Sequence, residues 1–89
     1  MKAIVTVVGK DRVGIIAAVC TKLAQYNINV LDISQTVMQG YFTMMMVTDI
    51  EKATMPLAEL AVDMEKVGTD MGMSIRIQRA DIFDAMHRI

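Results

Sequence analysis

The sequence has little of what would support a metal, redox or nucleic-acid function. It contains one cysteine, Cys20, and one histidine, His87, in 89 residues. It therefore lacks the paired cysteines of a disulfide and the ligand cluster of a zinc site. Nine basic residues stand against ten acidic ones, with no basic run. We therefore expect no metal, no cofactor and no nucleic-acid partner.

Long hydrophobic runs and a secretory leader are also missing. No apolar run approaches the ~20 residues that a membrane-spanning helix needs. Met1 leads directly into a strand-like run, without the basic, apolar and small-residue segments of a signal peptide. We therefore expect a cytoplasmic protein that does not contact the membrane.

Aromatic residues are scarce, whereas aliphatic ones are abundant. Hydrophobic residues make up 54% of the chain and aromatic residues only 4%, and the mean hydropathy is +0.41. The core must therefore be built from Val, Ile, Leu and the ten methionines. A chain of this length buries only about 60–65% of its unfolded surface. Self-association would cover the remaining apolar surface, so we expect a homo-oligomer, with a dimer as the simplest form.

The first half of the chain reads as a strand, a helix and a hairpin. Residues Lys2 to Val8 are β-branched and end at Gly9, as in a central strand. Helical spacing starts at Ile15 and stops near Asn27, a residue that suits a left-handed helix end. Two alternating runs follow, Asn29 to Met38 and Tyr41 to Thr48, joined by a tight turn at Gln39-Gly40.

The second half predicts a helix and a last strand. Thr54 and Pro56 mark a helix start, and apolar residues continue at helical spacing until the segment from Gly68 to Gly72 breaks the pattern. Alternation from Met73 to Gln78 predicts the fourth strand. Residues 80–89 then carry an apolar side typical of a short amphipathic helix: Ile82, Phe83, Met86 and Ile89.

This order predicts an α+β fold of the ferredoxin-like βαββαβ type. Right-handed crossovers put both helices on one face of a four-stranded antiparallel sheet, with the first and third strands central. We assign the domain to residues 1–79 and a tail helix to residues 80–89. Both central strands are apolar on both faces, so the face opposite the helices must be covered by the tail, by a second copy, or by both.

The segment from Gly9 to Ile15 is the strongest local signal. It lies between a strand and a helix start, where free backbone N–H groups and the positive end of a helix dipole attract carboxylate or phosphate. Gly14 has no Cβ, so a ligand or another chain can approach the backbone closely. The alternative is structural: Asp11 caps the helix and the glycines only turn the chain.

The phrase Gly9-Lys10-Asp11-Arg12-Val13-Gly14-Ile15 after a strand, with Ile28-Asn29-Val30 after the helix, resembles the ACT domain. In that family the pattern is roughly Gly-x-Asp/Asn-Arg-Pro-Gly-Ile/Val, and Val13 stands where proline is usual. The chain is particularly similar to small single-domain bacterial ACT proteins with a short C-terminal extension, related to the ACT units of glycine-cleavage regulators. The resemblance covers Lys2 to about Arg79.

This resemblance implies a regulatory domain that binds an amino acid or a related metabolite at a subunit interface. Its implied binding residues are Asp11, Val13, Gly14, Ile15 and Asn29. Backbone N–H groups around Val13 and Gly14 would hold an α-carboxylate, and Asp11 with the Asn29 amide would accept from an α-ammonium group. A local role also remains open for Asn29, whose side chain would then bond the backbone at the strand start.

Other candidate residues have simpler interpretations. Cys20 lies on the apolar stripe of the first helix and reads as a small core residue rather than a nucleophile. His87 is interpreted as a helix-end residue, because no other histidine or cysteine is near it in sequence to complete a metal site. The run Met44 to Met46 reads as strand core. No catalytic group emerges, and we expect no enzyme activity.

Other families share this topology but not its residues. An RNA-recognition domain needs a basic and aromatic third strand, and the run from Tyr41 to Thr48 contains no Lys or Arg. An acylphosphatase needs an arginine in a phosphate-binding first loop, and the sequence around Arg12 does not match. A heavy-metal chaperone needs paired cysteines. The remaining alternative to a sensor is a dimerisation module with no small-molecule ligand.

Overall fold

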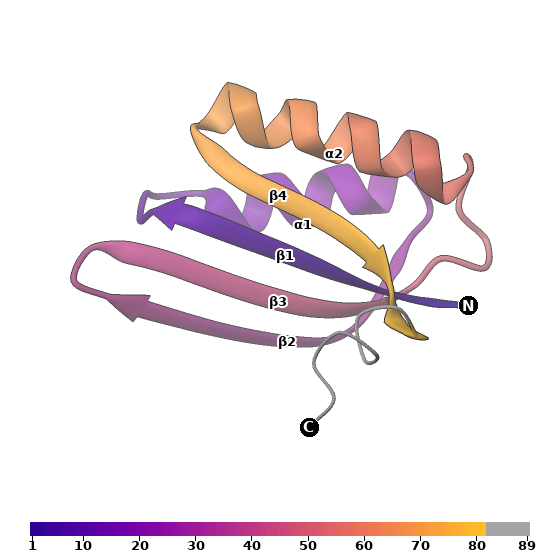
Figure 1. Ribbon diagram of the computed structural model, residues 1–89, viewed down its shortest axis with the longest axis horizontal. Coiled ribbons are helices and arrows are strands. Elements are labelled where there is room, and N and C mark those ends of the chain that lie inside the picture. The colour runs from indigo at the N-terminus through magenta and orange to yellow at the C-terminus, as the bar shows by residue number, and fades with distance from the viewer. Residues whose placement is uncertain (82–89) are drawn as a thin grey trace.

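The structure is a computed structural model that describes residues 1–81, and these form the predicted βαββαβ fold. The sheet order is β2-β3-β1-β4 with antiparallel neighbours throughout, and both helices lie on one face of the sheet (Figure 1). The strands β1 and β3 are central, as predicted. The elements are β1 (Lys2–Lys10), α1 (Ile15–Gln25), β2 (Asn29–Met38), β3 (Tyr41–Asp49), α2 (Leu57–Met71) and β4 (Met73–Arg79).

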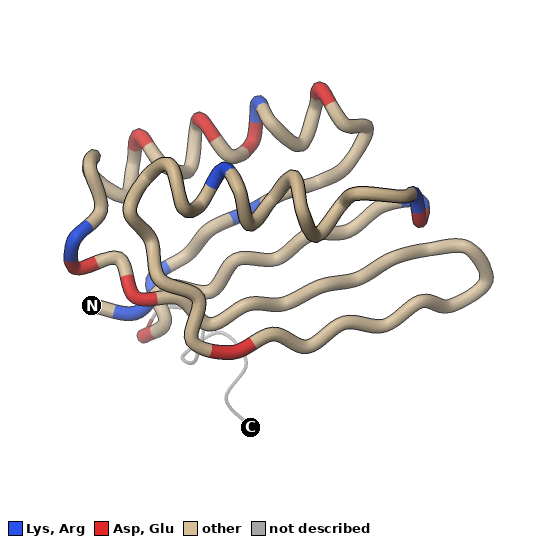
Figure 2. The backbone as a smooth tube through the Cα atoms, turned by 180° about the vertical axis from the view of Figure 1, so that it is seen from behind, with Lys and Arg blue, Asp and Glu red and all other residues tan. Residues whose placement is uncertain are grey.

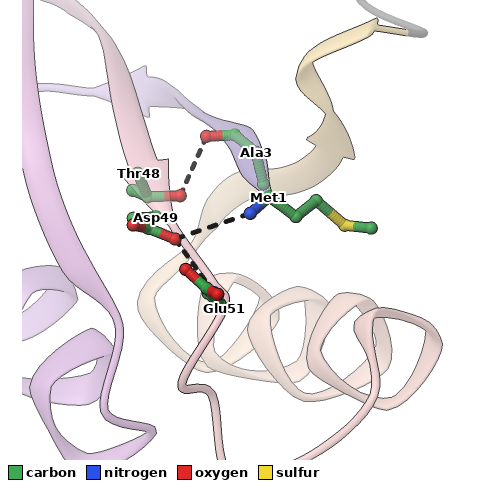
Figure 3. Close-up of polar contacts among 5 residues, drawn as sticks. All are labelled: Met1, Ala3, Thr48, Asp49 and Glu51. Atoms are coloured by element: carbon green, nitrogen blue, oxygen red, sulfur yellow. Dashed lines mark hydrogen bonds and ion pairs between the residues drawn. The ribbon is translucent and has the colours of Figure 1, made fainter.

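The core lies between the sheet and the two helices, and methionines do much of its packing. Alternate residues of each inner strand point toward the helices, because successive side chains of a strand face opposite sides. Within residues 1–81, Thr48 is the one polar residue buried there, and its hydroxyl donates to the Ala3 carbonyl at 2.8 Å (Figure 3). The fully buried side chains include Val5, Val7, Val19, Leu23, Met44, Met46, Leu60 and Met64.

The turns have the backbone conformations that the sequence predicts. Asn27 has φ 60° just after α1, and its left-handed conformation redirects the chain into β2. Gln39 and Gly40 have φ 52° and 83°, the pair of positive values of a type I′ hairpin turn. The hairpin β2–β3 is therefore closed by the predicted two residues.

Two glycines behave differently from the prediction. We expected β1 to end at Gly9, but β1 continues to Lys10, and Gly9 pairs with Phe42 on one side and Met73 on the other. Within the segment from Gly68 to Gly72, where we expected the helical pattern to break, α2 runs through Gly68 to Met71 and ends at Gly72, with φ 72°. A Cβ on Gly68 would lie 2.7 Å from the Met73 carbonyl oxygen, so this glycine lets α2 pack closely on β4.

The close packing of α2 on β4 leaves the opposite edge of the sheet bare. Every residue of β2 except Val30 is exposed, including Leu31, Ile33 and Val37. The register of β2 against β3 shifts between Val30 and Asp32, so Leu31 lies at a bulge. The edge strand β2 is thus exposed from Leu31 to Met38, on both faces of the sheet.

The predicted tail helix at 80–89 falls outside the described residues, apart from Ala80 and Asp81. Asp81 forms an ion pair with Arg79 at 2.7 Å. His87 and the apolar residues of the tail also lie outside the described part of the chain. Within residues 1–81, neither helix is long and apolar enough to cross a membrane.

Candidate ligand site at the β1–α1 loop

The loop between β1 and α1 is anchored on both sides. The Asp11 backbone N–H donates to the Gly40 carbonyl in the β2–β3 turn at 2.8 Å. The Arg12 guanidinium donates from Nη1 to the Met71 carbonyl, at the end of α2, at 2.9 Å. The loop is therefore held between the hairpin turn and the C-terminal end of α2, although its side chains are exposed.

The start of α1 is open to solvent. Gly14 is the N-cap residue with φ 87°, and no side chain caps the first turn, which also has no acidic residue. The Ala18 N–H donates to the Gly14 carbonyl at 2.9 Å, so the amides before it in the first turn lack a helical acceptor. The alternative in which Asp11 caps α1 is wrong, because its carboxylate makes no hydrogen bond to these amides. The first turn therefore presents N–H groups and the positive end of the helix dipole.

The predicted site residues around this turn have different surroundings. Val13 is fully exposed, and a Cβ on Gly14 would meet no atom within 4 Å. Ile15 is 2% exposed and belongs to the core, so only its backbone faces outward. Asp11, Val13 and Gly14 therefore lie together around a free helix start, and Ile15 anchors that start to the core.

Asn29 lies at the other end of the sheet. It pairs with Asp49, which also pairs with Lys2 at the start of β1, whereas the loop follows Lys10 at the end of β1. At about 3.3 Å per strand residue, the two ends of β1 are separated by roughly 26 Å. A single chain therefore does not bring Asn29 to Asp11 and Gly14.

A shallow polar hollow of about 450 Å³ surrounds Asn29, and the sequence analysis did not identify it. Its polar groups already bind one another: the Asn27 side chain donates to the Lys52 carbonyl at 2.9 Å, and the Glu51 N–H donates to Asp49 Oδ1 at 3.0 Å. The amino terminus approaches the same oxygen at 3.8 Å (Figure 3). These contacts hold the end of the sheet together. The lining residues are Ala24, Asn27, Ile28, Asn29, Asp49, Glu51 and Lys52.

Two further reactive side chains in the described part of the chain, Tyr26 and Cys20, contribute to the fold. The Tyr26 hydroxyl donates to Asp63 Oδ2 at 2.9 Å and joins the end of α1 to α2. Burial raises the pKa of Tyr26, and the hydrogen bond to Asp63 and its charge raise it further. Cys20 is partly buried and packs against the core, as predicted. Within residues 1–81, no three His, Cys, Asp or Glu residues lie close enough to hold a metal ion.

Sequence comparison matches residues 2–78 to the ACT domain model. The chain belongs to the ACT domain family. A UPF0237 protein of Bifidobacterium longum is 56% identical over 99% of this chain and 98% of its own length. A UPF0237 protein of Listeria monocytogenes is 51% identical over the full length of both chains. The resemblance stated from the loop residues is therefore confirmed.

Solved structures agree with this assignment. An ACT domain protein from Streptococcus pneumoniae superposes with a TM-score of 0.83 at 46% identity, covering 98% of each chain. A formyltetrahydrofolate deformylase from Pseudomonas syringae gives 0.80 at 23% identity, but this chain covers only 27% of it. A protein assigned as a glycine cleavage system transcriptional repressor gives 0.75 at 20% identity over 45% of its length. The last two share the ACT fold alone.

ACT domains are generally small-ligand regulatory domains. The family match occupies nearly all of the described chain, and residues 1–81 contain no second, catalytic domain.

Proposed function

We propose that this ACT domain is a regulatory module that binds an amino acid or a related metabolite at the β1–α1 loop, at the boundary between two subunits. The observation that carries the proposal is the uncapped start of α1 behind Gly14. Its free amides suit an α-carboxylate, and the exposed Asp11 carboxylate nearby suits an α-ammonium group. The two halves of an amino acid are thereby matched by groups of opposite charge.

A second subunit would supply what one chain lacks at this site. If two β2 edges pair antiparallel about a two-fold axis near Ser34, with all helices on one side, the partner subunit's Asn29 comes level with Met38. Met38 pairs with Tyr41 beside the β2–β3 turn, and that turn accepts the Asp11 N–H. Asn29 would then reach the loop in trans rather than in cis.

The charges on the two sheet edges favour β2 as the pairing edge. Edge strands that avoid association carry charges along their length. The strand β4 carries Arg76 and Arg79, so a symmetric β4 pair would bring like charges together, whereas β2 has Asp32 as its one charge. Across a β2 pair, Val37 and Leu31 of the two chains would cover apolar surface that is exposed in one chain.

The alternative function is a dimerisation or protein-interaction module with no small-molecule ligand. The bare β2 edge favours it directly, because pairing of this strand needs nothing bound at the loop. The two proposals share the dimer and differ only in the ligand, so a binding measurement separates them.

Isothermal calorimetry against a panel of amino acids tests the proposal. We expect one of them to bind with a dissociation constant below the millimolar range. Ile33→Lys should abolish both binding and the pairing of the β2 edges, because it puts a charge in the β2 pair. The exposed Gln25→Lys on α1 is the matched control and should change neither.

Two results separate the proposals. If no amino acid or related metabolite binds at millimolar concentration while the dimer persists, the chain is the ligand-free module. If an Ile33→Lys variant that has lost the β2 pairing binds the ligand as tightly as the parent does, the site is complete in one chain and the trans role of Asn29 is rejected.

A further inference from the structure

The open face of the sheet, turned away from the helices, has a second exposed apolar surface, although Ile4 on the same face is buried. Four large apolar side chains on it are exposed: Val8, Met38, Tyr41 and Met45. The register places them on one side, because Thr6 pairs with Met45, Val8 with Thr43, and Met38 with Tyr41. Most of the length of the strands carries no charge (Figure 2). An apolar surface of this extent marks an interaction site.

Opposite charges lie on the two edges of the open face. One row of paired residues crosses the four strands from Asp32 on β2, through Val47 and Ile4, to Gln78 on β4. Arg76, on the same face of β4, is in the adjoining row with Thr6 and Met45. Three strand spacings separate the acidic edge from the basic edge, about 14 Å. The face is thus acidic on one side, apolar in the middle and basic on the other.

We propose that a second copy of the chain covers the open face, related by a two-fold axis parallel to the strands. This axis lays β2 of each chain over β4 of the other, so Asp32 faces the partner subunit's Arg76 twice. It also lays β1 over β3, which brings Lys2 toward the partner subunit's Asp49. The apolar middle, with Met45 and Val8, packs against its own copy.

The charges discriminate between this axis and its alternative. A two-fold axis across the strands would lay β4 over β4 and bring Arg76 close to the partner subunit's Arg76. Like charges brought together across an interface oppose that arrangement. Aligned packing of two sheets at about 30° is a common geometry for a β-sandwich and is compatible with the favoured axis.

The size of the face is compatible with a reversible interface. Four strands of about nine residues span roughly 19 by 30 Å, so two opposed faces, less the part around Ile4 that is already buried, bury on the order of 1,000 Å². Specific interfaces start at about 1,000–1,200 Å². The charge pairs lie at the rim, so they orient the two copies and make association sensitive to salt.

Charge reversal tests the proposal, with mass measured by sedimentation velocity on the full chain. D32R and R76D should each raise the dissociation constant of the parent assembly at least tenfold. An equal mixture of the two variants should recover the parent mass. In a mixed pair, one chain has a positive charge at both positions and the other a negative charge at both, so opposite charges meet at both contacts. K66D, a reversal on the exposed surface of α2, is the matched control and should leave the mass unchanged.

Other outcomes overturn the proposal. If D32R and R76D keep the parent mass, the open face is not the interface; a change seen only on deletion of residues 82–89 would identify the tail as its cover. A mixture that fails to recover the mass rejects this axis. A parent that is monomeric at all concentrations rejects the interface itself.

Asp32 also accepts the Ile33 N–H at 2.9 Å, so D32R could misfold for a local reason. If circular dichroism shows this, the variants D32N and R76Q are used instead of D32R and R76D, and they should weaken association equally.

Discussion

Gly14 has a left-handed backbone conformation that favours glycine, and the space above its backbone is open. Its φ of 87° lies in the left-handed region, which a residue with a Cβ occupies at a cost of about 1 kcal/mol. Nothing lies within 4 Å of the position that its Cβ would take, so the space above the backbone is available to a ligand. Strain and obstruction must therefore be separated when this residue is changed.

The first prediction concerns this separation. Gly14→Leu should abolish amino-acid binding in calorimetry, because the side chain fills the space above the helix start. Gly72→Leu, at another open glycine with positive φ, should lower the free energy of unfolding by a similar ~1 kcal/mol and leave binding unchanged. Equal loss of binding in both variants would indicate that destabilisation, and not obstruction, is responsible.

The second prediction concerns Asp11, whose side chain does not cap α1, so that binding and stability can be tested separately. Asp11→Ala should weaken binding of an amino acid about tenfold or more through loss of a charged acceptor, equivalent to at least ~1.4 kcal/mol. The melting temperature should hardly move, since no capping bond is lost. A variant that melts earlier and binds normally would show that the carboxylate serves the fold alone.

The third prediction concerns Tyr26 and the change of folding stability at alkaline pH. Its pKa is raised above the ordinary value of 10.0, first by burial and then by Asp63, so the neutral hydroxyl is favoured in the folded chain. The stability that it contributes is fully present below pH 10 and is lost as pH rises through the raised pKa. In chemical unfolding between pH 9 and pH 12, the wild type should lose more stability than Tyr26→Phe; parallel curves would contradict this.

At the scale of elements, the position of α2 determines which parts of the sheet are free. Gly68 allows α2 to approach the backbone of β4, and a Cβ there would also meet Ile75 at 3.0 Å. The helix α2 lies along β4, and α1 contacts β2 only weakly, so β2 is left mostly exposed (Figure 1). The edge proposed for dimer formation is therefore a consequence of packing at the opposite edge.

Gly68→Ala should accordingly destabilise the fold, although alanine favours helices. The added methyl group meets backbone rather than a flexible side chain, and such overpacking costs about 1–3 kcal/mol. Thr69→Ala, at the next and exposed position, is the control and should change the free energy of unfolding by no more than about 0.5 kcal/mol. A Gly68→Ala variant that is more stable than the parent in urea would show that α2 can lift from β4 without loss.

At the scale of the whole molecule, the chain has more apolar surface than its own fold covers. The uncovered parts are distinct: the flank of β2 with Leu31, Ile33 and Val37, and the open face with Met45 and Tyr41. Two independent contacts between copies would build a larger assembly than a dimer. Mass measured as a function of concentration therefore depends on both proposed contacts. Ile33→Lys at the β2 edge and R76D at the open face test the two contacts separately.

Deleting residues 81–89 tests the sequence-based prediction for the tail. Burial of side chains such as Ile82 and Phe83 typically stabilises by ~1.5–3 kcal/mol each, so the shortened chain should melt at a lower temperature and be less soluble. A matched chain with Ile82 and Phe83 changed to serine should reproduce the loss if burial is the cause. An unchanged melting temperature and solubility in both would make the tail an appendage.

Much of the fold followed from the sequence because its determinants are local. The period of apolar residues distinguished strands from helices, and Asn27, Gln39 and Gly40 predicted turns through their tolerance of positive φ. The motif from Gly9 to Ile15 also indicated the family and the position of the open helix start. The helix end was predicted only to the segment from Gly68 to Gly72, because the role of Gly68 depends on the distant strand β4, which local pattern does not reveal.

Only the tertiary structure decided how the candidate residues lie relative to one another. From the sequence we predicted Asp11, Gly14 and Asn29 as binding residues for an amino acid, because the family pattern associates them. The direction of the strands then separates Asn29 from the loop by the length of β1, so the three residues can meet only between two chains. Register across four strands likewise put Asp32 and Arg76 on opposite edges of one face. Such relations depend on pairings between distant segments, and a linear pattern carries no information about them.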